Sequence, residues 1–195
     1  MDLKTRATNI LTRPAVEWPS IAAEATTPMD LITSYAAPLS AVAAVSAFIG
    51  LSIVGMSVPL IGGTFRTPIL SGLTSAVVRF VLGLVGLYVS AIIIEKLAPT
   101  FQSKGDTTQA MKLVVFASTP IWVASVLQII PALGILVLLA ALYAVYLFYL
   151  GLTPVMQTPG DKVIPYMVVA AIVIVVLNLC FGFIAAAIAG AGTYI

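Results

Sequence analysis

Two long stretches of the chain contain no charged residue, and they restrict the possible folds more than any other feature. One lies between Asp30 and Arg66, and the other runs from Leu113 to Gly160. Only 8% of the 195 residues are charged and 61% are hydrophobic, whereas soluble domains carry about 25% charged residues. A soluble protein of this length could not cover its surface with so few polar groups. The lipid bilayer is therefore the expected solvent.

Five segments are long and apolar enough to cross a membrane, which takes about 20 residues of helix. The run after Leu113 is too long for one crossing, and Pro131 divides it because proline removes a helical hydrogen bond. We expect an all-α membrane protein with five transmembrane helices in one bundle. A leader, residues 1–34, precedes the single domain, residues 35–195. The expected spans are 35–58, 69–97, 111–130, 132–152 and 163–191.

The leader is the most polar part of the chain. Leu3, Ala7 and Ile10 recur at helical spacing, which predicts a short interfacial amphipathic helix that ends at Pro14. Two hypotheses follow: the leader is a passive membrane anchor, or it is a docking face for a cytoplasmic partner. The candidate docking or interfacial residues are Arg6, Arg13, Trp18, Glu24 and Asp30.

Basic residues in the loops predict the orientation, because loops rich in Lys and Arg stay in the cytoplasm. With five spans, the side of the N-terminus holds seven basic residues and the other side holds only Arg66. We therefore expect a cytoplasmic N-terminus and a C-terminus outside. Partners would be the lipid bilayer and a protein on the cytoplasmic side. The seven basic residues are Lys4, Arg6, Arg13, Lys96, Lys104, Lys112 and Lys162.

Arg79 is the one ionisable residue assigned to the middle of a span. Charged residues at such depth are costly and usually face the bundle interior or a watery cavity. In one hypothesis Arg79 is structural, and it snorkels outward or clamps helix ends. In the other, Arg79 forms an anion or lipid-headgroup site with Asn178. The candidate intramembrane polar site consists of Arg79, Gln128 and Asn178.

The sequence contains no recognisable catalytic constellation. Histidine is absent, the single Cys180 lies in an apolar run, and no phosphate-binding or nucleophile motif occurs. We therefore expect no catalytic residues, no metal, no cofactor and no nucleic-acid partner.

Small residues recur every four positions on two spans, which lets helix backbones approach closely in lipid. Such faces can also pack against a second copy of the chain and form a homo-oligomer. The positions are Ala36, Ser40 and Ala44 on the first span, and Gly182, Ala186 and Gly190 on the fifth.

The series from Ala117 to Lys162 resembles the Yip (Ypt-interacting protein) family of membrane proteins, and in particular its bacterial branch, whose function is largely unknown. The stretches "ILTRPAVEWPSI" and "YAAPLSAV" resemble the segment that leads into the first span of the bacterial proteins. The likeness covers nearly the whole chain. The resembling positions are Pro120, Trp122, Pro131, Gly134, Tyr143, Tyr146, Gly151, Pro159 and Lys162.

The resemblance implies a five-span fold with a cytoplasmic N-terminus in a bacterial inner (plasma) membrane. Eukaryotic relatives bind Rab-type GTPases through a longer cytoplasmic region with an Asp-Leu-Tyr-Gly-Pro motif, which this sequence lacks. Our first functional hypothesis is a non-enzymatic protein that organises membrane or partner proteins through its cytoplasmic face. The alternative is a small transporter or channel that uses the polar intramembrane site.

Overall fold

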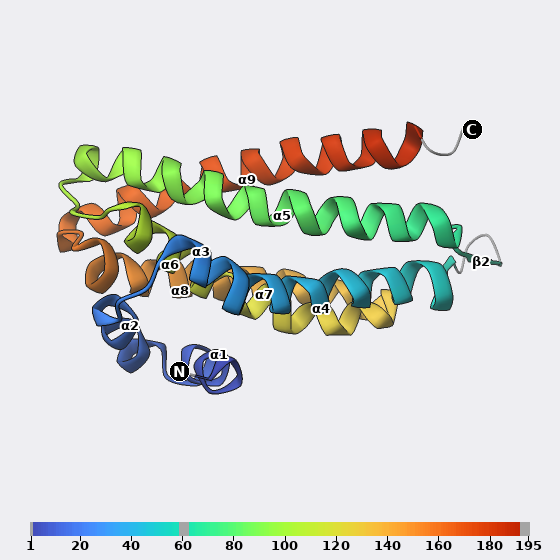
Figure 1. Ribbon diagram of the computed structural model, residues 1–195, viewed down its shortest axis with the longest axis horizontal. Coiled ribbons are helices and arrows are strands. Elements are labelled where there is room, and N and C mark those ends of the chain that lie inside the picture. Colours follow the sequence, from blue (N-terminus) through green and yellow to red (C-terminus); the bar gives the residue numbers. More distant parts are fainter. Residues whose placement is uncertain (1, 59–62, 192–195) are drawn as a thin grey trace.

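The computed structural model describes residues 2–58 and 63–191 of the chain. The leader forms two short helices, α1 (Leu3–Thr12) and α2 (Pro14–Ala23), which meet at Arg13 (Figure 1). The Asp2 side chain accepts a hydrogen bond from the backbone N–H of Thr5 and caps α1. Pro14 begins α2, where its missing N–H costs nothing. The predicted amphipathic helix is therefore present, and a second helix follows it.

The first span begins earlier than its apolar composition indicates. Thr27 and Asp30 form a capping box, in which each side chain bonds the backbone N–H of the other. The helix then widens into a π-helical turn before Pro38, which has no N–H for a regular bond. The segments are α3 (Pro28–Leu31), η1 (Ile32–Ala36), α4 (Ala37–Phe48) and η2 (Ile49–Val54).

The first span also ends before residue 58, because Gly55 adopts a positive φ of 86° and reverses the chain. Two short antiparallel strands follow, β1 (Met56–Val58) and β2 (Gly63–Phe65), in which Met56 pairs with Phe65. This small hairpin was not predicted from the sequence. We call this end of the molecule the hairpin end and the opposite end, which carries α1 and α2, the leader end.

The other four spans follow the predicted order. Pro131 separates the third from the fourth, because Ile130 leaves the helix with an extended backbone. The third span is also interrupted at Ser118, two residues before Pro120. The segments are α5 (Ile69–Leu97) with η3 (Ala98–Phe101), α6 (Thr107–Ala117) with α7 (Thr119–Ala124) and η4 (Ser125–Ile129), η5 (Pro131–Ile135) with α8 (Leu136–Met156), and α9 (Gly160–Ala191).

The five spans pack into one bundle, which confirms the predicted fold class. In Figure 1, α5 and α9 run side by side along one edge, and α4, α7 and α8 run along the other. Helix α6 packs against both α5 and α8 at the leader end. The third span is the central one: 67% of its apolar stretch is buried inside the protein, against 17% or less for the other spans.

Candidate functional site

The guanidinium group of Arg6 holds the two leader helices together. Its Nη1 atom lies 2.6 Å from a carboxylate oxygen of Glu17, and its Nη2 atom pairs with Glu24. The guanidinium carbon also lies 5.7 Å from the ring centroid of Phe116, within the range of a cation–π contact. Arg6 itself is only 4% exposed. The sequence analysis proposed Arg6 as a docking or interfacial residue, but in the structure its partners lie within the protein itself.

Lys112 attaches the leader to the third span. Its ammonium group donates hydrogen bonds to the backbone oxygens of Ala22, at 3.1 Å, and Glu24, at 2.7 Å. These carbonyls end α2 and have no partner within a regular helix, and a cation is favoured at this negative end of the helix dipole. The side-chain amide of Gln109 also donates to Ala22. Lys112 is 2% exposed, although the sequence placed it among the loop residues.

Trp18 is buried rather than interfacial. It is 1% exposed, and its ring meets Phe116 edge-on at a centroid separation of 6.5 Å. Gly151 on α8 makes this packing possible, since a Cβ atom there would lie 2.9 Å from the Trp18 ring and 2.5 Å from Leu113. The indole N–H has no hydrogen-bond partner among the described residues. Packing therefore holds Trp18 in place.

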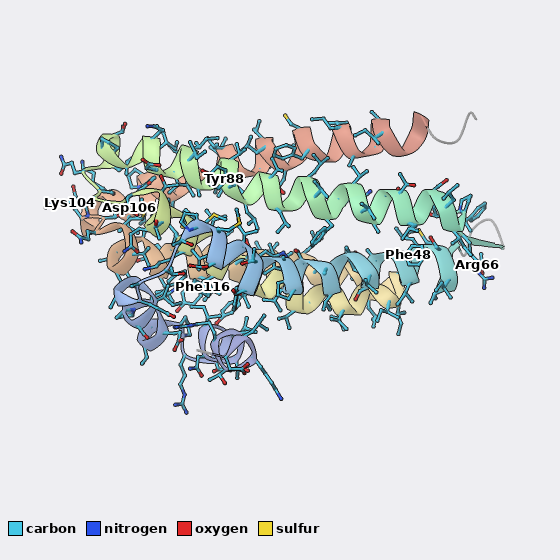
Figure 2. All side chains as sticks on the ribbon, in the orientation of Figure 1. Phe48, Arg66, Tyr88, Lys104, Asp106 and Phe116 are labelled. Carbon is cyan, nitrogen blue, oxygen red and sulfur yellow. The ribbon has the colours of Figure 1, made fainter. Side chains whose placement is uncertain are left out.

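Two tyrosine hydroxyls complete the leader end. Tyr143 on α8 donates to the backbone oxygen of Leu11, at 2.7 Å. The hydroxyl of Tyr35 lies 2.9 Å from that of Thr119, and its ring packs against Phe116 at 4.7 Å. Phe116 thus lies among the leader, the first span and the third span, and Figure 2 shows it beside α2.

The remaining predicted leader residues are more accessible. Arg13 is exposed. Glu24 pairs with Arg6 but leaves 43% of its side chain exposed. Asp30 is exposed and serves as part of the capping box with Thr27. Of the five residues singled out in the leader, these three reach the surface.

The candidate intramembrane residues Arg79, Gln128 and Asn178 line one cavity of about 450 Å³. They come from α5, η4 and α9, and the cavity lies between the α5–α9 pair and the helices α4 and α7. The structure therefore brings together three side chains that are far apart in the sequence. It does not pair them, since no hydrogen bond joins any two of them in the described chain.

The polar side chains of the cavity differ in whether they have hydrogen-bond partners within the protein. Asn178 donates to the backbone oxygen of Ile174 on its own helix, at 2.8 Å. Ser118 and Ser125 likewise donate to their own helices. The side chains of Arg79 and Gln128 make no hydrogen bond or ion pair within the described part of the chain.

A close helix contact fixes the position of Gln128. A Cβ atom on Gly50 would lie 1.9 Å from the backbone oxygen of Gln128, so only glycine fits there. The turn η2 therefore lies directly against η4 and holds the third span where it ends. In the rest of the described chain, no group of three or more His, Cys, Asp or Glu side chains could hold a metal ion.

The positions that carry the family resemblance lie mostly at breaks and helix contacts. Pro120 is the second residue of α7, while Pro131 and Gly134 lie in η5. Trp122 lines the cavity and approaches the ring of Tyr35. The contacts of Tyr143 and Gly151 are described above. Tyr146 is exposed, and its ring lies against that of Tyr143. The last two positions are Pro159, whose backbone oxygen accepts from Lys162, and Lys162, which lies 3.4 Å from Asp161.

The small residues do not close the bundle in the way the sequence predicts. Ala36 is fully buried, but Ser40, Ala44 and Gly182 line the cavity. Ala186 is exposed. Some of these small residues therefore allow close contact between helices, and others border the space between them.

We call the residues that join the leader to the bundle the leader-end cluster: Arg6, Glu17, Trp18, Glu24, Lys112 and Phe116. The sequence analysis did not identify Glu17, Lys112 or Phe116 as candidate site residues. Lys112 is a charge within an apolar helical stretch, "AMKLVVFAST". That was the one available signal, since a buried charge needs a partner.

The sequence matches the model of the Yip1 domain over residues 8–191, which is nearly the whole chain. No curated protein and no solved structure matches it. The match includes the cavity and the leader-end residues from Glu17 onward, and it begins two residues after Arg6. The chain is a member of the Yip1 domain family.

Proposed function

We propose that this Yip1-domain protein is a non-enzymatic membrane protein that organises membrane or partner proteins through its leader end. The observation that supports the proposal is the attachment of the leader to the bundle through Arg6, Lys112 and Trp18. A fixed leader presents a surface of defined shape, and preorganisation lowers the entropic cost of binding. A leader that only anchored the chain in the interface would need none of these contacts.

The charge distribution supports a cytoplasmic position for the leader end. Lys104 and Asp106 lie at this end of the molecule, and Arg66 lies at the other (Figure 2). An excess of basic residues on one side favours the cytoplasm. We therefore propose a bacterial inner membrane location with the N-terminus inside and the C-terminus outside.

The exposed part of the leader has the composition of a protein contact surface. Val16 is 73% exposed and Met29 is also exposed, and the charged leader residues Arg13, Glu24 and Asp30 are accessible as well. Apolar side chains with a polar rim are typical of transient interfaces. We propose these five residues as the docking surface for a cytoplasmic protein.

Site-specific photo-crosslinking in intact membranes tests this proposal. A photoreactive residue at Val16 should give a discrete protein adduct, and Arg13→Glu in the same chain should abolish it. The matched control is a photoreactive residue at Val176, which is exposed on α9 and faces lipid in the proposed orientation. Adducts that are the same at both positions, or unchanged by Arg13→Glu, would contradict the docking role.

The cavity favours a second candidate function, transport of a small anion. Arg79, Gln128 and Asn178 converge there, and irregular helices within the membrane often form transport sites. The test is anion flux into sealed vesicles that contain the purified protein, compared with vesicles that contain the Arg79→Leu variant. Flux that is equal in both and equal to that of empty vesicles would rule this candidate out.

The small-residue face of α9 supports a proposal about assembly. Gly182 and Ala186 are exposed and four residues apart, and such faces associate in lipid because backbones can approach closely. We expect Ala186→Leu to reduce the mass of the complex measured by mass photometry in lipid nanodiscs. A monomeric wild-type protein would contradict this proposal.

A further inference from the structure

The cavity between the helices contains one charged side chain, and that charge is positive. Arg79 is the single ionisable residue among the described residues that line it. The other polar side-chain groups are amides, hydroxyls and the indole N–H of Trp122. A cation would therefore meet no carboxylate in the cavity, whereas an anion would meet a guanidinium group with five N–H donors.

The unused hydrogen-bonding groups also suit an anion. The hydroxyls of Ser40, Ser118 and Ser125 and the Asn178 amide donate to their own helices. The donors that remain without a partner in the described chain belong to Arg79, Gln128, Ser90 and Trp122. Of these, Arg79 and Gln128 come from different spans. Arg and amide donors of this kind match the oxygens of a phosphate group, and the guanidinium can bind two of them at once.

The walls of the cavity are largely apolar. Phe80 and Leu87 come from α5, and Ile174 and Phe181 come from α9. A free, hydrated anion would use only the polar part of this lining, and its charge would lose water without full compensation. An amphiphile with an anionic group and a hydrocarbon chain matches both parts of the lining.

The packing of the helices leaves one side of the cavity open to lipid. Helix α5 packs against α4 and against α9, and so closes one side. In the described part of the chain, α9 has no packed interface with α4 or with α7. At the hairpin end, Gly72 approaches Ser52 so closely that a Cβ atom would lie 2.0 Å from its hydroxyl, which closes that end. Entry is therefore sideways, from the bilayer.

We infer that this cavity binds one acidic phospholipid, with its phosphate on Arg79 and Gln128 and an acyl chain along the apolar faces of α5 and α9. Arg79 lies about 15 Å along α5 from Ile69 at 1.5 Å per residue. The phosphate is therefore held well along the span, on its hairpin-end half, and is distinct from lipid at the membrane surface. A volume of about 450 Å³ lies within the range of small-molecule sites. This inference does not depend on docking at the leader end.

Native mass spectrometry of the full-length chain in detergent tests the inference directly. The probes are dioleoyl-phosphatidylglycerol, which is acidic, and dioleoyl-phosphatidylcholine, which has the same chains and no net charge. We expect one phosphatidylglycerol molecule to be retained in preference to phosphatidylcholine. Arg79→Gln should weaken its binding about tenfold, because it removes a charge-assisted hydrogen bond. The control is Arg66→Gln, at an exposed arginine outside the cavity, and it should change nothing.

A second variant keeps the inference testable if Arg79→Gln fails to fold. Gly83 lines the cavity, and a Cβ atom there would meet nothing within 4 Å. Gly83→Leu should therefore fill the cavity without a clash and displace the phosphatidylglycerol. The docking variant Arg13→Glu should leave lipid binding unchanged, which separates this inference from the proposed function.

Three results would overturn the inference. One is equal retention of the two lipids, which indicates ordinary annular lipid. The second is phosphatidylglycerol binding that neither Arg79→Gln nor Gly83→Leu changes. The third is displacement of phosphatidylglycerol by millimolar inorganic phosphate, which assigns the cavity to a soluble anion.

Discussion

Lys112 and Arg79 are both cations within apolar spans, yet their surroundings are opposite. Lys112, at the leader end, is buried and donates to two backbone carbonyls at the end of α2. Arg79, toward the hairpin end, lines a cavity and has no partner in the described chain. A buried cation with satisfied donors stabilises a fold, whereas one held beside open space is available to a ligand. The comparison separates the leader end, where the buried cation is structural, from the cavity toward the hairpin end, where the cation is available to a ligand.

Removal of the Trp18 side chain should have the largest effect on stability. Trp18→Ala would leave a cavity against Phe116 and Gly151 and lower the free energy of unfolding by about 3–5 kcal/mol. Thermal unfolding in detergent, followed by circular dichroism, measures the loss. Val16→Ala, on the exposed face of the same helix, is the control. A loss no larger than that of Val16→Ala would show that the leader does not pack on the bundle in solution.

Arg6→Met should have the next largest effect. It leaves the buried carboxylate of Glu17 without its partner, which costs about 3–5 kcal/mol when the remaining charge stays buried. Because the double variant Arg6→Met with Glu17→Gln removes that charge, it should recover part of the loss. Chemical unfolding of the single and double variants gives this coupling directly. If the double variant is no more stable than Arg6→Met, the ion pair does not hold the leader helices.

Lys112→Met should cost less, about 1–3 kcal/mol, because it leaves the carbonyls at the end of α2 with fewer donors. Gln109 still donates to one of them, which limits the effect. Lys104→Met, at an exposed lysine in the loop that precedes α6, should change stability by no more than about 0.5 kcal/mol. Equal effects of the two substitutions would show that the hydrogen bonds of Lys112 do not stabilise the leader end.

Arg79→Leu should have the smallest effect on the lipid-free protein. No hydrogen bond or ion pair of the described chain is lost, and a charge within a span is itself unfavourable. We expect the free energy of unfolding in detergent to stay within about 0.5 kcal/mol of wild type or to rise. A loss as large as that of Arg6→Met would mean that Arg79 is a structural clamp, and the distinction between the two ends would fail.

The sequence predicted the spans well because hydrocarbon length and charge are local properties. The division at Pro131 was predictable for the same reason, since proline acts on its own helix. The limits of the first span were less accurate. The Thr27–Asp30 capping box extends the helix at its start, and Gly55 ends it. Both effects depend on hydrogen bonds and backbone angles that composition does not reflect.

The two candidate regions differed in how far the sequence could predict them. Arg79, Gln128 and Asn178 stand out because each is polar in an apolar span, although only the packing of three helices brings them to one cavity. The leader-end cluster was less accessible to prediction. A tryptophan is common both at a membrane interface and in a protein core, so the sequence around Trp18 does not distinguish the two positions. Gly151, on a distant span, makes room for the buried ring. The partners of Lys112 are backbone atoms, which no sequence pattern marks.

The most direct test of the difference between the two ends is the unfolding temperature of Arg6→Met and Arg79→Leu, each with and without phosphatidylglycerol. A ligand that binds only the folded state raises that temperature. We predict that Arg6→Met unfolds at a lower temperature but still gains stability from the lipid. Arg79→Leu should keep the wild-type temperature in detergent and gain nothing from the lipid. The opposite pattern, or a loss of both properties in both variants, would contradict the account.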